Sequence, residues 1–273
     1  MEIVLLGTGF PVPHPDRAGP ATLVRAGGLN LLFDAGRGVL MRLAGAGVLP
    51  FQLDAVFLTH LHSDHVTDFN DVMTMNWAGR LDTDPLGVVG PDGTAEFCEL
   101  TKASLHRDIG WRIAHHATLN TGPRFDVTEV LDGPAFERDG VRVVAAATHH
   151  PPVEPSIGFR IEHGGKGVVI GGDSLPCEGL DRLCAGANVY VQTVLRRPLV
   201  EQIAHPRIQD ILTYHSSTED AARTAAKAGV GTLVFTHMMP APARGTEQDW
   251  IDDAKAHFDG DVLVGTDLQT IEV

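Results

Sequence analysis

The stretch "LTHLHSDHV", residues 58–66, places His60, His62, Asp64 and His65 within six positions. Residues two apart in an extended chain point to the same side, so His60 and His62 can face one centre. Asp64 and His65 enter a predicted helix, from which they can face a second centre. Imidazole and carboxylate groups without a soft thiolate suit zinc, iron, nickel or manganese. The motif therefore predicts a metal site.

Four apolar segments of the chain end in a potential metal ligand. They end at His60, at His149 and His150, at Asp173 and at His237. Ligands of open α/β sheets bind beyond the carboxyl ends of the strands, so these four ends predict one shared site. Two metals about 3.5–4 Å apart would share Asp173 and a water molecule whose pKa is brought to about 7.

The adjacent histidines His149 and His150 compete for one place in this site. Successive side chains of a strand point to opposite faces, so only one of the two can point inward. We expect His150 to be the ligand and His149 to be a neighbour with a structural role.

His215 has two interpretations. It precedes a helix that is predicted from a capping-box pattern at Ser216 and Glu219 and from Gly229 as the C-terminal cap. A helix N-terminus favours an anion. His215 is therefore either a proton donor or a cation that stabilises the transition state, or a histidine bonded to nearby backbone.

Short β-branched runs separated by helical segments predict an α/β fold. Further helices are expected from near Asp64 through residues 66–79 and near residues 247–258. The stretch from about Leu81 to Asp139, residues 81–139, has poor periodicity and predicts a lid or cap. We expect residues 1–273 to form one domain that carries this insertion.

The bulk composition restricts the partners and the compartment. The chain has 273 residues and a formal net charge of −14, which argues against a broad nucleic-acid surface. Cys98, Cys177 and Cys184 show no CxxC pairing, which suits a reducing cytosol. The sequence has no signal-peptide pattern and no apolar stretch of about 20 residues. We expect a soluble cytoplasmic protein that does not contact a membrane.

Several segments together resemble the metallo-β-lactamase superfamily, in the branch that holds ribonuclease Z and arylsulfatase-type hydrolases. In chain order they are "LLGTGFPVP", "FDAG", "THLHSDH", "HPPVEPSIGFRI", "IGGDS", "HSSTEDAARTAAKAGV" and "LVFTHMMP". The resemblance covers nearly the whole chain. It implies an αββα four-layer sandwich with a binuclear metal site at one edge.

The resemblance also implies a role for each candidate residue. One metal would take His60, His62 and His150, the other Asp64, His65 and His237, and Asp173 would bridge them. Asp64 would also accept a proton from the attacking water, and His215 matches the catalytic histidine. Zinc is the first expectation for both ions, with manganese and iron as alternatives. A homodimer is expected by analogy with the branch.

Two departures from the branch concern the mechanism and the substrate. A glutamate that often supports the catalytic histidine corresponds here to Gln192, which cannot stabilise a charged histidine as a carboxylate would. Typical ribonuclease Z enzymes carry a long tRNA-gripping arm before the bridging aspartate. Only residues 151–172 separate His150 from Asp173, so no arm fits.

These observations lead to a hydrolase of small phosphodiesters, such as cyclic nucleotides or aryl phosphodiesters. A metal-bridging hydroxide would attack phosphorus and His215 would protonate the leaving oxygen. Sulfate esters, acyl substrates and tRNA 3′-end processing are the alternatives, and RNA is disfavoured as a partner. A non-catalytic metal-binding or partner subunit is the alternative outside enzymes, but all ligand positions are filled.

Overall fold

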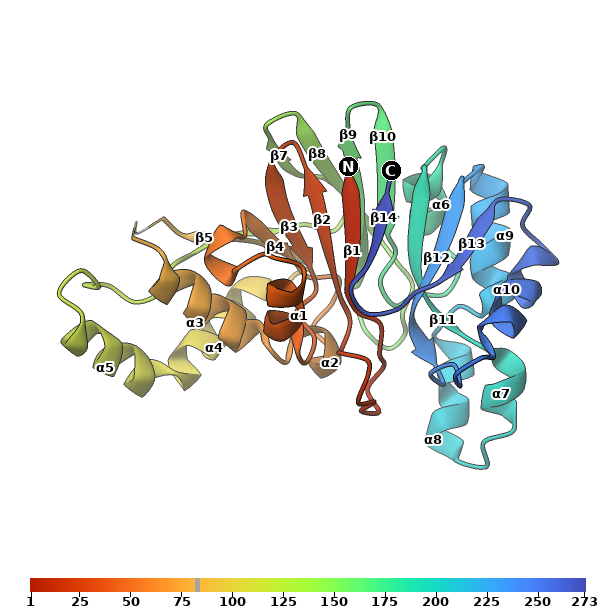
Figure 1. The fold of residues 1–273 in the computed structure, drawn as a ribbon, viewed down its shortest axis with the longest axis horizontal. Coiled ribbons are helices and arrows are strands. Elements are labelled where there is room, and N and C mark those ends of the chain that lie inside the picture. The colour runs from red at the N-terminus through yellow and green to blue at the C-terminus, as the bar shows by residue number, and fades with distance from the viewer. Residues whose placement is uncertain (82–83) are drawn as a thin grey trace.

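The computed structural model describes residues 1–81 and 84–273, which form two facing β-sheets with helices on their outer sides (Figure 1). The first sheet has the order β14 (Gln269–Glu272), β1 (Glu2–Gly7), β2 (Ala21–Ala26), β3 (Leu29–Phe33), β4 (Ala55–Phe57), β5 (Leu86–Gly90) and β6 (Phe125–Glu129). The second has the order β13 (Asp261–Val264), β12 (Thr232–Met239), β11 (Val189–Leu195), β10 (Lys166–Ile170), β9 (Ile157–His163), β8 (Val141–Ala147) and β7 (Gly133–Arg138).

The helices divide into two sets along the chain. The first is α1 (Val39–Gly45), α2 (Ser63–Val66), α3 (Phe69–Gly79), α4 (Thr94–Ser104) and α5 (His106–His115). The second is α6 (Glu178–Cys184), α7 (Arg197–Glu201), α8 (Pro206–Gln209), α9 (Thr218–Ala228) and α10 (Glu247–Lys255). Short 3₁₀ turns lie at Pro50–Gln52 and Asp210–Thr213.

Three hydrophobic clusters hold the layers together. The central cluster fills the space between the sheets, where the rings of Phe33 and Phe57 stack with centroids 4.6 Å apart. A second cluster packs helices such as α1 and α3 on the first sheet, and a third packs α6, α9 and α10 on the second. Successive side chains of a strand face opposite sides, so alternate residues pack either in the central cluster or in the cluster under the helices. The predicted αββα sandwich is confirmed.

Parallel pairing brings the strand ends of each sheet to one edge. Strands β3, β4, β5 and β6 run parallel in the first sheet, and β10, β11, β12 and β13 run parallel in the second. Parallel strands have their carboxyl ends on the same side. This arrangement gathers the residues that follow β4, β10 and the neighbouring strands.

The stretch 81–139, predicted as a lid or cap, has two kinds of structure, and its residues 82–83 lie outside the described part. Strands β5, β6 and β7 belong to the sheets. Helices α4 and α5 project at one end of the molecule, with α5 outermost (Figure 1). The sequence pattern did not reveal β5 as a strand of the sheet because "LGVVG" is a short apolar run, and such runs carry little periodicity. In the structure this run pairs with β4.

Helix α9 begins one residue later than its predicted start. Ser217, not Ser216, is the N-cap, and its hydroxyl accepts a hydrogen bond from Asp220 N at 3.1 Å. The hydroxyl of Ser216 instead donates to the carbonyl oxygen of Ser174 at 2.7 Å. Gly229 ends the helix with a φ of 68°, as predicted.

The predicted helix from Asp64 is divided into α2 and α3. The backbone turns between Val66 and Phe69, where the Asp68 carboxylate accepts a hydrogen bond from Gly38 N. Across residues 1–81 and 84–273, every helix is too short or too polar to traverse a bilayer.

Candidate metal centre

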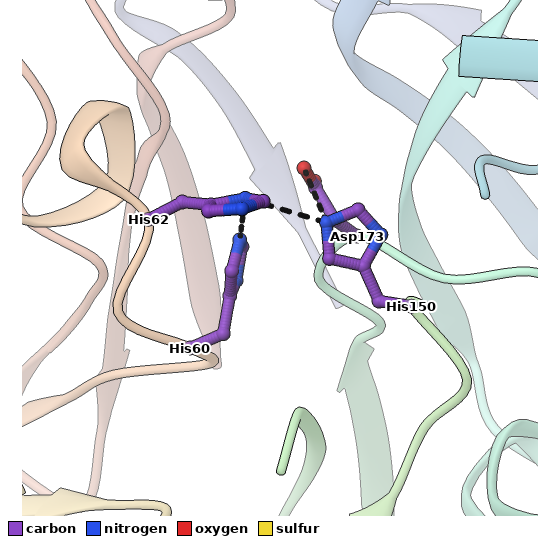
Figure 2. A group of neighbouring side chains, drawn as sticks. All are labelled: His60, His62, His150 and Asp173. Carbon is purple, nitrogen blue, oxygen red and sulfur yellow. Dashed lines mark hydrogen bonds and ion pairs between the residues drawn. The ribbon is translucent and has the colours of Figure 1, made fainter. Parts of the chain in front are cut away.

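The first group of candidate ligands consists of His60, His62, His150 and Asp173 (Figure 2). The loop after β4 supplies two histidines, and the loops after β8 and β10 supply His150 and Asp173. Nδ1 of His62 lies 3.0 Å from Nε2 of His60 and 3.4 Å from Nε2 of His150. The four ligand atoms all lie within 4.8 Å of one another, which is close enough for one metal ion to contact them together.

The second group consists of Asp64, His65 and His237. The first two belong to α2, and His237 lies in β12. Nε2 of His237 is 3.1 Å from Oδ2 of Asp64, and Nε2 of His65 is 3.7 Å from the same oxygen. The group joins a helix of the first half of the chain to a strand of the second sheet.

Asp173 lies between the two groups. Its Oδ2 is 3.3 Å from Nε2 of His65, 3.6 Å from Nε2 of His237 and 4.0 Å from Nε2 of His150. The carboxylate therefore approaches members of both groups, as a bridging ligand would.

The backbone at His237 directs this side chain toward the site. His237 has a φ of 45°, which is uncommon for a residue that is not glycine. The register between β11 and β12 shifts between Thr193 and Leu195, beside this residue. A bulge of this kind re-aims a side chain near a functional site. Residues held in this region of φ cluster at such sites.

Asp34, in the "FDAG" segment, supports both groups, and the sequence interpretation assigned it no role. Its Oδ2 accepts a hydrogen bond from Nδ1 of His65 at 2.8 Å. The Thr59 hydroxyl donates to the same oxygen at 3.0 Å and accepts from Nδ1 of His60 at 3.0 Å. With Nδ1 protonated in both rings, each Nε2 lone pair faces the centre. The signal available in the sequence was an aspartate directly after an apolar strand, the same pattern that marks the other candidates.

The structure separates His149 from His150. His150 is buried, and its Nδ1 donates to the carbonyl oxygen of Tyr214 at 2.9 Å, which leaves Nε2 facing the site. His149 is exposed, and its backbone pairs with Leu175. As alternation predicted, only one of the two side chains points inward, and it is His150.

Burial keeps two of the histidines neutral. Desolvation lowers the pKa of His60 well below its ordinary value. Desolvation also lowers the pKa of His150 to about 4, although Asp173 opposes this change. Neutral imidazole is the form that binds a metal, so both rings are ready to do so at neutral pH.

The residues around the bridge position carry opposite charges. Burial lowers the pKa of His65, but the carboxylates of Asp173 and Asp34 outweigh it, and the pKa is raised well above its ordinary value. Burial raises the pKa of Asp173, but His237, His65 and His215 outweigh it, and the pKa falls well below its ordinary value. The carboxylate is thus ionised, as a metal ligand must be.

Two buried atoms test whether these residues fit a pair of metal ions. Nε2 of His65 and Oδ1 of Asp173 have no hydrogen-bond partner within the described part of the chain. Buried polar atoms are rarely left unpaired. With Nδ1 of His65 donating to Asp34, Nε2 faces Oδ2 of Asp173 at 3.3 Å, and positive charge at Nε2, from a proton or from a metal ion, makes this contact favourable. The imidazole and carboxylate set therefore suits a dinuclear metal site.

His215 lies against this site, but Gln192 does not support it. Nε2 of His215 is 3.1 Å from Oδ2 of Asp173, and Nδ1 has no partner among the residues that the structure describes. Gln192 Nε2 donates to the carbonyl oxygens of Gly172 and Thr193, both at 3.1 Å. The Tyr190 hydroxyl donates to Gln192 Oε1 at 2.7 Å. Gln192 thus holds the backbone before Asp173, and no hydrogen bond joins it to His215.

Comparisons with known proteins agree with this geometry. The profile described as Beta-lactamase superfamily domain matches residues 29–238. A protein named Ribonuclease Z from Mycolicibacterium paratuberculosis is 53% identical over all of this chain and 98% of its own length. A Ribonuclease Z from Mycobacterium tuberculosis is 51% identical over the same shares.

Solved structures share the fold. The metallo-beta-lactamase fold protein YhfI from Bacillus subtilis has a TM-score of 0.76 and 22% identity, covering 100% of this chain and 98% of that one. Human tRNase Z, short form, has a TM-score of 0.75 and 21% identity, covering 100% and 99%. The chain belongs to the metallo-β-lactamase superfamily, in the branch that includes the proteins named ribonuclease Z, and it is a metal-dependent hydrolase.

Proposed function

We propose that this protein is a ribonuclease Z-type endoribonuclease that cleaves tRNA precursors at their 3′ ends. The observation that carries the proposal is its 53% identity, over its full length, to a protein named Ribonuclease Z. This finding favours RNA, which composition and the missing arm disfavoured, over the small substrates first expected.

The missing arm does not separate this chain from those relatives. Strands β9 and β10 are joined directly through Gly164 and Gly165, so no arm projects there. The alignment to the Mycolicibacterium protein covers 275 residues and 98% of that protein. A relative of nearly the same length has no room for a long additional arm. The absence of an arm is therefore shared with proteins that carry this name.

The proposal gives each candidate residue a task. His60, His62 and His150 would hold one metal, Asp64, His65 and His237 the other, and Asp173 both. Bound metal ions supply a water activated at neutral pH and positive charge beside the phosphate.

The protein's own groups would then move the protons. The Asp64 carboxylate would accept a proton from the attacking water, and burial does not neutralise it, because the neighbouring His237 keeps its pKa low. His215 would protonate the leaving oxygen. Its hydrogen bond to Asp173 fixes the orientation of the ring.

Small phosphodiesters are the second candidate substrate class. The direct β9–β10 connection favours them, because it provides no extended surface for gripping a large substrate. The same site chemistry would serve both classes, since both reactions break a phosphodiester bond.

Three further features belong to this proposal. Zinc is the expected metal, because three imidazoles with carboxylates are a common zinc ligand set. The cytoplasm is the expected compartment, because Cys98, Cys177 and Cys184 are all free thiols. A homodimer is expected from the resemblance to the branch.

A paired turnover assay tests the function. Zinc-loaded protein is given an unprocessed tRNA precursor in one series and an aryl phosphodiester in the other. We expect cleavage of the precursor at its 3′ end. The His215→Ala variant should keep its metal content and lose about 10²–10⁴-fold in turnover on the precursor, the usual range for an acid–base group.

Each result of this assay leads to a different conclusion. Cleavage of the aryl diester without cleavage of the precursor would replace the RNA proposal by the small-substrate candidate. Unchanged precursor turnover in His215→Ala would remove His215 from the mechanism. Metal content, measured by elemental analysis, separates loss of catalysis from loss of the metal site.

A further inference from the structure

The segment 100–124 is basic within an acidic protein. Its charged residues are Lys102, Arg107, Asp108, Arg112 and Arg124, and it also holds His106, His115 and His116. The whole chain has a formal net charge of −14. A local excess of positive charge in such a chain marks a surface that suits an anionic partner.

Helix α5 (His106–His115) has an inner face toward the protein and an outer face toward solvent. The inner face holds the buried Ile109 and the Arg112 guanidinium, whose Nε donates to Asp108 Oδ2 at 2.7 Å. Arg107, Trp111 and His115 are exposed, and their spacing of four residues places them on one face. We call these three residues the α5 face.

Trp111 is presented on this face without cover. Its side chain is 69% exposed, and two of its neighbours on the helix, Gly110 and Ala114, are too small to hide the ring. Within residues 1–81 and 84–273, neither the Trp111 indole nor the Arg107 guanidinium forms a hydrogen bond or an ion pair. Helix α5 is outermost at its end of the molecule (Figure 1).

The α5 face is connected to the metal centre by α3. Helix α3 begins at Phe69, close to the candidate ligands of α2, and its 11 residues span about 16 Å. At its far end, Trp77 Nε1 donates to the carbonyl oxygen of Thr121, in the loop after α5, at 2.9 Å.

We propose that the α5 face binds the RNA substrate at a distance from the scissile bond. An unpaired base would stack on Trp111, and Arg107 and His115 would contact the phosphates on either side. Aromatic rings that stack on bases beside cationic side chains are the usual means of binding single-stranded RNA. The inference rests on the proposed function only in taking RNA as the substrate. Charge complementarity favours RNA over a protein partner on this face.

The test measures RNA binding separately from cleavage. The probe is mature tRNA with a fluorescent label, titrated with metal-loaded, full-length protein at several salt concentrations. Trp111→Ala should raise the Kd on the order of tenfold, because one stacked base is lost. Arg107→Ala should raise the Kd and reduce the slope of log Kd against log salt by about 1, because one phosphate contact is lost. Turnover of the aryl phosphodiester should not change in either variant.

Met41→Ala is the matched control for removal of an exposed apolar side chain. Met41 is 76% exposed and belongs to α1, away from the α5 face. This variant should bind tRNA as the wild type does. The oligomeric mass of all variants is measured by light scattering, because an exposed tryptophan can also mark a subunit contact.

The outcomes distinguish this inference from the proposed function. If the wild type cleaves precursor tRNA and the α5 variants bind and cleave equally well, the inference is overturned and the proposed function stands. If the wild type binds tRNA through the α5 face without cleaving the precursor, the inference stands and the proposed function fails. If the wild type does not bind tRNA, or if Trp111→Ala changes the oligomeric mass, the α5 face is not an RNA surface.

Discussion

At the scale of single residues, Asp34 connects the two ligand groups. It holds His65 directly and His60 through the Thr59 hydroxyl, so one carboxylate orients a histidine of each group. A partner of this kind fixes the tautomer and the direction of the ligating ring. Metal affinity should therefore depend on a residue that touches no metal.

Asp34→Asn should weaken metal binding by about 10–100-fold while the fold is retained. Asparagine tolerates the positive φ of this position, and its side-chain oxygen can still accept from Thr59 N. It cannot provide the negative charge that His65 faces. Competition with a chelator gives the metal affinity, and circular dichroism checks the fold.

Asp54→Asn provides the control for this measurement. Asp54 is also an aspartate with a structural hydrogen bond, to Asn30 N at 2.8 Å, but it contacts no candidate ligand. Equal metal affinities in Asp34→Asn and Asp54→Asn would show that Asp34 does not tune the centre.

At the scale of elements, α9 positions His215. The helix is capped by Ser217, whose hydroxyl accepts from Asp220 N while the Asp220 carboxylate accepts from Ser217 N, both at 3.1 Å. His215 stands two residues before this cap, and Ser216 between them is tied to Ser174, the neighbour of Asp173. The cap thus determines where the chain leaves the helix and enters the site.

Ser217→Ala should lower the free energy of unfolding by about 1 kcal/mol, which corresponds to a fall in Tm of about 2–4 °C. Ser217→Gly should cost only a few tenths of a kcal/mol, because glycine is itself tolerated at an N-cap. Differential scanning calorimetry on metal-loaded protein gives both values. An alanine variant as stable as the wild type would mean that the cap contributes nothing to α9.

At the scale of the whole molecule, the metal centre joins the two sheets. Four candidate ligands follow β4 of the first sheet, namely His60, His62, Asp64 and His65. The other three belong to the second sheet: His150 and Asp173 lie in the loops after β8 and β10, and His237 lies in β12. Ions held by both sheets would bind the folded state and not the unfolded chain, so they would stabilise the fold.

Removal of the metals should therefore destabilise the whole domain. With free metal about 1,000-fold above its Kd, each site contributes about 4 kcal/mol, so chelation should lower Tm by about 10 °C or more. The measurement is thermal unfolding with and without chelator, followed by metal addition. Asp173→Ala should remove most of this difference, and an undiminished difference in that variant would argue against Asp173 as the shared ligand.

The sequence alone determined the chemistry and the layers of this protein. Hydrophobic runs that end in histidine or aspartate are local patterns, and so is the helix signal that ends at Gly229. Alternation between adjacent residues, also local, predicted that only one of His149 and His150 points into the site.

The tertiary structure alone decided the supporting contacts. Asp34 meets His65 across 31 positions of the chain, and Gln192 holds Gly172 across 20 positions instead of supporting His215. The bulge that turns His237 inward depends on the pairing of β12 with β11, and the loop after α5 is tied to α3 by the hydrogen bond from Trp77 Nε1 to the carbonyl oxygen of Thr121. Such contacts follow from how the two sheets pack and pair, because partners distant in the chain leave no periodic signal along it.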